Sequence, residues 1–147
     1  AMIEAVFDTN VIVAGFASPL GVPGRRLDYA GLGAVHLVVS EHILTELGIA
    51  LREPYFRARF TERETENALE LVRKRATIVE ITDPLQGVAS HSSDDPVVAT
   101  AVNAGAQYLV TGDRELRRLG RYRNVTILTP QEFLPLVEAD ITEPDPA

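Results

Sequence analysis

Short apolar runs rich in β-branched residues alternate along this chain with segments of helical periodicity. This alternation is typical of βα units and predicts a mostly parallel sheet covered by helices. The predicted strands are Ile3–Phe7, Val35–Val39, Thr77–Ile81, Gln107–Thr111 and Val125–Leu128. The sequence therefore predicts an α/β fold, a three-layer α/β/α sandwich with a five-stranded sheet, over residues 2–137.

Capping residues mark several of the predicted helices between these strands. Ser40 can cap a helix that runs to about Arg52, and Thr61 with Glu64 forms a capping box for a helix to about Arg75. A further helix, Asp95–Ala104, has Pro96 near its start and Gly105 after its end. The other predicted helices are Val11–Ala17, Arg25–Leu32, Arg114–Leu119 and Pro130–Val137, with a Pro/Gly loop at Ser18–Gly24.

The charges are unevenly distributed along the chain. The net charge is −7, but residues 138–147 contain four acidic and no basic residues, and the charge without those four acids is −3. We expect this segment to be an acidic, flexible tail. The basic residues are almost all arginines and occur in groups, of which one spans residues 114–123. Such groups usually lie on solvated helix faces, so they only support other indications of phosphate binding.

The composition excludes several classes of protein. The chain has no cysteine, which excludes disulfides, thiolate metal sites and cysteine catalysis and fits a reducing compartment such as the cytoplasm. No apolar run approaches the roughly 18–20 residues that a membrane-spanning helix needs. We therefore expect a cytoplasmic protein without a membrane span.

Acidic residues stand where predicted strands end and where a helix begins. Asp8 directly follows the first strand, and Asp113 follows the fourth after a single glycine. Asp94 and Asp95 stand at the start of the helix that carries Val97. Ligands of open parallel sheets bind at the carboxyl ends of the strands, so these carboxylates are candidates for one shared site. The alternative for Asp94 and Asp95 is a simple helix cap.

Glu46 is a further candidate because of its place on the helix that follows Ser40. The apolar stripe of this helix contains Ile43, Leu44 and Leu47, and Glu46 lies at the flank of that stripe. From there its carboxylate can reach the carboxyl edge of the sheet. The alternative is an acid that faces solvent.

Converging carboxylates repel one another unless a cation neutralises them. Without cysteine or clustered histidine, the available ligands are hard oxygens, which favour Mg²⁺ or Mn²⁺. Such ions activate water and stabilise the leaving oxygen of a phosphodiester. If the four tail acids and the five candidate site acids are set aside, the remaining residues carry a charge of +2, which permits binding to nucleic acid.

Four segments in order resemble the PIN-domain ribonucleases, and most of all the VapC-like toxin components of bacterial and archaeal toxin–antitoxin systems. Each motif is weak alone, but four in order at domain-wide spacing are specific. The segments are Val6–Ile12, Ser40–Leu47, Asp94–Ala101 and Tyr108–Asp113.

This resemblance implies an α/β/α fold, a Mg²⁺- or Mn²⁺-dependent acidic site and endonucleolytic cleavage of RNA. It places Asp8, Glu46 and Asp113 among the catalytic and metal-binding acids. The remaining acid is Asp94 if one counts back from Ala101, whereas the position of Pro96 makes Asp95 the natural helix cap. We take Asp94 as the ligand and Asp95 as a cap or an outer acid.

Three small polar residues match positions beside the acids of the family. Thr9 and Asn10 would orient Asp8 or hold a metal-bound water, and Thr111 could bond a carboxylate. The alternative for all three is turn and cap chemistry. The three histidines, His36, His42 and His91, are assigned no role in the site.

The resemblance also implies an RNA substrate, a cognate antitoxin protein and a homodimer. Two other functions compete with the ribonuclease. One is a catalytically silent PIN-like module that binds RNA or protein. The other is a phosphohydrolase similar to the haloacid dehalogenases, since Asp8 and Asn10 resemble their strand–Asp–x–Asp motif. Asn10 replaces the second acid of that motif.

Overall fold

A computed structural model describes residues 3–17, 35–89 and 92–142 of the chain. Its strands are β1 (Ile3–Phe7), β2 (Val35–Val39), β3 (Thr77–Ile78), β4 (Tyr108–Val110), β5 (Arg121–Tyr122) and β6 (Val125–Leu128). Its helices are α1 (Thr9–Ala17), α3 (Glu41–Ala50), α4 (Pro54–Arg57), α5 (Glu62–Arg75), α6 (Asp95–Ala104), α7 (Arg114–Leu119) and α8 (Pro130–Thr142), with a 3₁₀ turn at Ser92–Asp94. The predicted loop 18–24, the helix 25–32 and His91 lie outside the described residues.

The sheet has the strand order β3-β2-β1-β4-β6-β5, and every pair except β5–β6 is parallel. The chain leaves β1 toward β2 and β3 on one side and then returns to β4 on the other side of β1. The strand order therefore reverses between β1 and β4, and this is the point at which open α/β sheets bind their ligands. The predicted α/β architecture with a mostly parallel sheet is confirmed.

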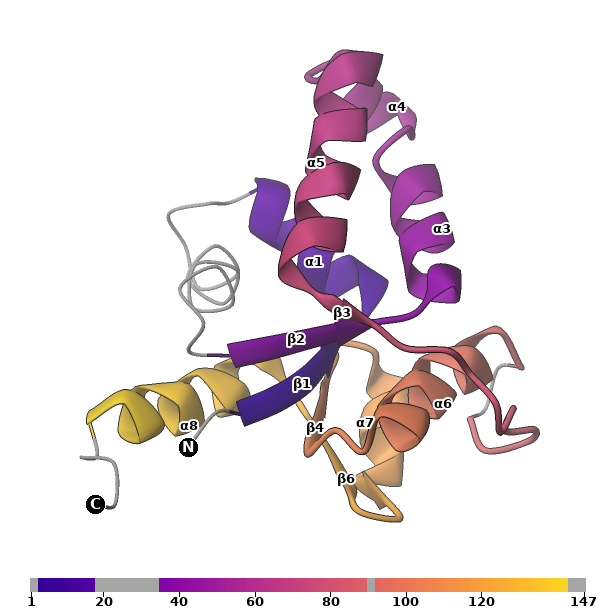
Figure 1. The fold of residues 1–147 in the computed structure, drawn as a ribbon, viewed down its shortest axis with the longest axis vertical. Helices are drawn as coiled ribbons and strands as arrows, with labels where there is room; N and C mark the ends of the chain where they lie inside the picture. Colours follow the sequence, from indigo (N-terminus) through magenta and orange to yellow (C-terminus); the bar gives the residue numbers. More distant parts are fainter. Residues whose placement is uncertain (1–2, 18–34, 90–91, 143–147) are drawn as a thin grey trace.

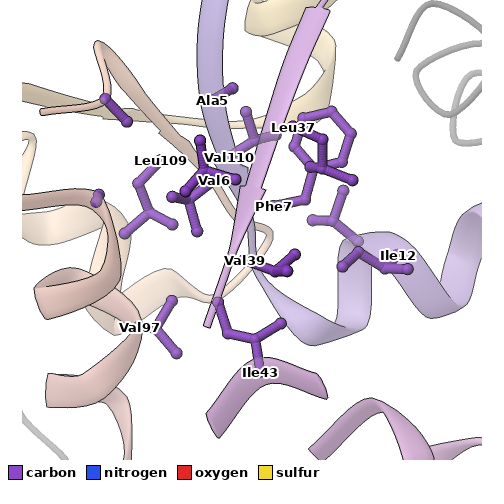
Figure 2. Close-up of a cluster of buried hydrophobic side chains, with 14 of the residues drawn as sticks. Ala5, Val6, Phe7, Ile12, Leu37, Val39, Ile43, Val97, Leu109 and Val110 are labelled. Atoms are coloured by element: carbon purple, nitrogen blue, oxygen red, sulfur yellow. The ribbon is translucent and has the colours of Figure 1, made fainter. Parts of the chain in front are cut away.

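The two faces of the sheet bury alternate residues of β1. Val6 and its neighbour Leu109 lie on the side of Val97 from α6, whereas Phe7 lies on the side of Ile12 from α1 (Figure 2). The Phe7 ring also meets the Phe133 ring of α8 edge to face, with the centroids 5.7 Å apart. Helices thus cover both faces, as the burial of nearly every residue in β1 requires.

Figure 1 shows α3, α4 and α5 as an arm that projects away from the sheet. The predicted caps hold its helices: the Ser40 hydroxyl accepts from the Ile43 amide at 3.4 Å, and Thr61 and Glu64 form the complete capping box. Helix α3 ends at Ala50, two residues before the predicted end at about Arg52. Pro54 then begins the short helix α4, because proline is well suited to a first helical turn.

The structure differs from the predicted elements at both edges of the sheet. At one edge, β3 covers only Thr77–Ile78 of the predicted strand Thr77–Ile81. A sixth strand, β5, forms an antiparallel hairpin with β6 through Arg123, whose φ is +52°. Glycine is the usual residue at such a turn, so an arginine there concealed the hairpin from sequence reasoning. Helix α8 also continues beyond Val137 to Thr142. Residues 143–147 of the expected acidic tail lie outside the described residues.

No helix in the described part of the chain is both long enough and apolar enough to cross a membrane.

The contact between Phe7 and Phe133 predicts a large cost for shortening Phe133. Phe133 is fully buried, so Phe133→Ala should lower the free energy of unfolding by about 3–5 kcal/mol through lost burial and a residual cavity. Urea unfolding followed by circular dichroism measures this change. Leu136→Ala on the same helix is the control, because Leu136 is 41% exposed and its truncation should cost under about 0.5 kcal/mol. Equal losses in the two variants would contradict the described packing of α8.

Candidate acidic site at the carboxyl edge of the sheet

Asp8 lies immediately after β1 and is 92% buried, since only 8% of it is exposed. Its backbone amide donates to the Val110 carbonyl at 3.0 Å, which extends the β1–β4 pairing by one residue. Its carboxylate accepts from the Thr111 hydroxyl at 2.8 Å. The position is therefore set by the sheet itself and not by a loose loop.

Thr111 links the first acid to Asp113. Its hydroxyl donates to Asp8 and accepts from the backbone amide of Asp113 at 3.0 Å. Asp113 in turn caps α7, since its carboxylate accepts from the amides of Glu115 and Leu116 at 2.8 and 3.2 Å. Thr111 thus has both of the roles considered for it: it stabilises the turn before α7 and it orients the Asp8 carboxylate.

Glu46 reaches the same edge from α3. Its carboxylate accepts from the Thr9 hydroxyl at 3.4 Å, and the side chain is 38% exposed. His42, one helical turn earlier, places its Nε2 atom 3.0 Å from the other carboxylate oxygen. Sequence reasoning gave His42 no role, although the i, i+4 spacing on a helix is the signal that could have paired it with Glu46.

The charges of these acids act on one another. Burial is the main reason that the pKa of Asp8 is raised above its ordinary value, and the negative charges of Asp113 and Glu46 raise it further. Hydrogen bonds from Thr111 and from the Thr9 backbone oppose this shift. Asp113 and Glu46 thus lie near enough to Asp8 to repel its negative charge, which is the condition that a bound cation relieves.

Asp95 lies beside Asp94 but has a structural task. It is buried, and its carboxylate accepts from the backbone amides of Gly87, Val88 and Ala89 at 3.0, 3.1 and 2.8 Å. It is the first residue of α6, so the expectation that it would be the N-cap is wrong; that position belongs to Asp94, which makes no side-chain cap bond. A carboxylate that holds three loop amides is poorly placed to serve a metal as well.

Asp94 lies half-buried at the beginning of α6. Because α6 is the crossover helix that leads from the β3 side into β4, its first turn faces the carboxyl edge of the parallel strands. Asn10, by contrast, is exposed on the first turn of α1, whereas Thr9 is buried.

The chemistry of these donors fits a hard divalent cation, but the described residues contain no group of three or more histidine or acidic side chains arranged to hold a metal ion. Magnesium commonly uses only one or two protein carboxylates and keeps several of its waters. The buried carboxylate of Asp8, with the half-buried Asp113 and Glu46 near enough to act on its charge, suits that mode of binding.

The raised pKa of Asp8 predicts that Asp8→Asn stabilises the protein at neutral pH. In the unfolded chain Asp8 has the ordinary pKa of 3.8, and in the folded protein its pKa is higher. The folded protein therefore holds the Asp8 proton more tightly than the unfolded chain does. Stability is therefore lost as the pH rises from the unfolded pKa through the folded one, and Asp8 stays unfavourable above it. The melting temperature without divalent ions should be higher for Asp8→Asn than for the wild type at pH 7, and the difference should shrink as the pH falls toward 4.

Asp83→Asn is the control for this prediction, because Asp83 is exposed and its partner Arg123 lies on the surface. It should show no gain at pH 7. A lower melting temperature for Asp8→Asn than for the wild type at every pH would contradict the described burial of the charge.

Comparisons with known proteins agree with this architecture. One similar structure is a chain of VapBC2 from Rickettsia felis, solved with a DNA fragment from the VapBC2 promoter. It superposes with a TM-score of 0.61 at 15% identity, over 86% of this chain and 98% of that one. PAE2754 from Pyrobaculum aerophilum superposes with a TM-score of 0.59 at 18% identity, over 95% and 99% of the two chains. An uncharacterized protein of Methanocaldococcus jannaschii, MJ1680, is 26% identical over 142 residues, which is 90% of each chain.

These likenesses show a shared fold, and the match to a family model is more specific. The model of the PIN domain matches residues 4–115, which include β1 with Asp8, α3 with Glu46, the start of α6 and β4 with Asp113. The matched segment covers most of the chain and every element that carries a candidate acid. The chain belongs to the PIN domain family.

Proposed function

We propose that this protein is a Mg²⁺- or Mn²⁺-dependent endoribonuclease and the toxin of a toxin–antitoxin pair. The observation that supports the activity best is the convergence of Asp8, Asp113 and Glu46 at the reversal point of the sheet, where their charges act on one another. Membership of the PIN domain family and the likeness of the fold to VapBC2 support the biological role.

The residues of the chain divide the work in this proposal. Asp8, Glu46, Asp94 and Asp113 would hold the divalent ions. The ions, when bound, would supply an activated water and stabilise the leaving oxygen of the phosphodiester. Thr111 orients Asp8 and fixes the backbone before Asp113, and Thr9 holds Glu46. These hydroxyls keep the carboxylates in position while they repel each other.

The partners in this proposal are an RNA substrate, an antitoxin protein that covers the acidic site, and a second copy of the chain in a homodimer. An RNA substrate and an antitoxin also imply a cytoplasmic location. These assignments rest on the family resemblance.

The silent PIN-like module is the main competing function. It predicts that the acids bind no metal, so a metal titration separates the two. The match to the PIN domain over residues 4–115 argues against the phosphohydrolase similar to haloacid dehalogenases.

Metal binding and cleavage should both depend on Asp8. Millimolar Mn²⁺ should raise the melting temperature of the wild type by several degrees, which corresponds to about 2–3 kcal/mol at a concentration of about 100 times the Kd. Asp8→Asn should lose this gain and reduce RNA cleavage by at least about 10³-fold, because the ion loses the carboxylate at the centre of the proposed site. Scanning calorimetry and a labelled-RNA cleavage assay measure the two effects.

Asp113→Asn is the companion variant, because asparagine still caps α7 and the fold should persist while cleavage falls. Glu132→Gln is the matched control: Glu132 caps the start of α8 and should leave cleavage unchanged. Undiminished cleavage by well-folded Asp8→Asn would refute the ribonuclease, and the absence of any Mn²⁺ effect on the wild type would favour the silent module.

The two neighbouring acids should separate into an active and a structural residue. Asp94→Asn should abolish cleavage while the protein stays folded, because asparagine suits the N-cap position of α6 as well as aspartate does. Asp95→Ala should destabilise the protein by about 2–4 kcal/mol, because three backbone amides lose their acceptor. Urea unfolding and the cleavage assay on both variants test this assignment. The reverse pattern, with a destabilised Asp94→Asn and an inactive but stable Asp95→Ala, would exchange the two roles.

A further inference from the structure

A group of exposed arginines lies along α7 and β5, beside the acidic site. We call this the α7–β5 arginine surface; its members are Arg114, Arg117, Arg118, Arg121 and Arg123. Sequence reasoning treated such groups as ordinary solvated helix faces, and the proposed chemistry of the carboxylates does not use them.

Helical spacing places three of these arginines on one face. Arg117 and Arg118 lie three and four residues after Arg114, so both are its neighbours on the outer side of α7. Leu116 lies on the inner side and is fully buried against the rest of the domain. The arginines are therefore held on a packed element, and their guanidinium groups project into solvent.

Most of the positive charge on this surface is not neutralised within the protein. Arg118 pairs with Glu115, and Arg123 pairs with Asp83, both at 3.4 Å. In the part of the chain that the structure describes, Arg114, Arg117 and Arg121 form no ion pair. Arg117 is attracted to the negative charge of Glu132 but forms no ion pair with it. The Glu132 carboxylate already accepts a hydrogen bond from the Thr129 amide.

Three arginines of the projecting arm behave differently. Arg52 and Arg57 both bind Glu62, at 2.7 and 2.6 Å, and Arg73 forms two bonds to Glu41, at 2.9 and 3.0 Å. The charges of these three arginines are largely satisfied inside the protein. Among the described residues, unpaired basic side chains also occur on the arm, at Arg63 and Lys74, but only those of α7–β5 begin beside Asp113.

The position of Arg114 breaks a local rule. It is the first residue of α7, where the helix dipole disfavours a positive charge and favours an acid. Residues that break a local preference without a local gain are often found at functional sites. Arg114 also directly follows Asp113, so the arginine surface begins at the acidic site and leads along α7 away from it.

We infer that the α7–β5 arginine surface binds the phosphates of a single-stranded RNA on one side of the site; this inference rests on the proposed function. The acidic chain as a whole repels nucleic acid, so binding needs a local positive surface next to the acids. Arginine forms paired bonds with phosphate oxygens. An acidic protein segment would offer similar groups, but RNA is favoured because the surface is continuous with a site proposed to act on a phosphodiester.

Binding of RNA in the absence of metal tests this inference separately from cleavage. The full chain is titrated, in EDTA, against a fluorescently labelled single-stranded RNA of about 12 nucleotides at several NaCl concentrations. The variant Arg114→Gln/Arg117→Gln should weaken the Kd at least about fivefold. It should also reduce the slope of log K against log[NaCl] by about 1.4, because each phosphate contact of a single strand contributes about 0.7.

The matched control is Arg63→Gln/Lys74→Gln, which removes the same charge from exposed positions of α5 on the arm. It should leave the Kd and the slope near those of the wild type. Equal values for the two double variants would overturn the inference, as would a surface variant that loses binding of poly-glutamate but keeps RNA. A wild type that binds RNA through this surface yet cleaves nothing would support the inference and refute the proposed function.

Discussion

The pairing of β1 with β4 is the contact on which the candidate site depends. These strands are far apart in the sequence, and their register places Phe7 opposite Val110. The residues that follow the two strands therefore meet, and the Thr111 hydroxyl reaches the Asp8 carboxylate at 2.8 Å. A shift of one residue in this register would turn the side chains of one strand to the opposite face and separate the two. The buried core around Val6 and Leu109 prevents that shift, so packing on both faces of the sheet also fixes the geometry of the acids.

The site is held together against an electrostatic cost. Burying Asp8 near two other acids raises its pKa and works against folding at neutral pH. The structure offsets part of this cost with hydrogen bonds from Thr111 and the Thr9 backbone, which lower the pKa of Asp8 and orient its carboxylate. A domain that only had to fold would have no need of such a charge at this place, and strain of this kind is common where a protein binds or reacts with a ligand.

The positive charges of the chain also differ in how far they are paired within the protein. On the arm, arginines are bound to Glu41 and Glu62 and stabilise how the helices pack. Along α7 and β5 they remain mostly uncompensated, and α7 begins directly after Asp113. A basic surface next to acidic residues suits a ligand that is itself anionic but reacts at a metal, since attraction and catalysis then come from neighbouring groups.

The amino-acid sequence by itself determined the elements whose signals are local. The β-branched runs, the caps at Ser40 and Thr61 and the glycine at 105 depend on interactions within a few residues, and these features were predicted close to where they occur. The places of Asp8 and Asp113 at strand ends were predictable for the same reason. Only the tertiary structure decided that Asp95 holds residues 87–89, that His42 lies against Glu46, and that Arg123 turns a hairpin. The partners of a side chain across the fold depend on register and packing, which no short stretch of sequence contains.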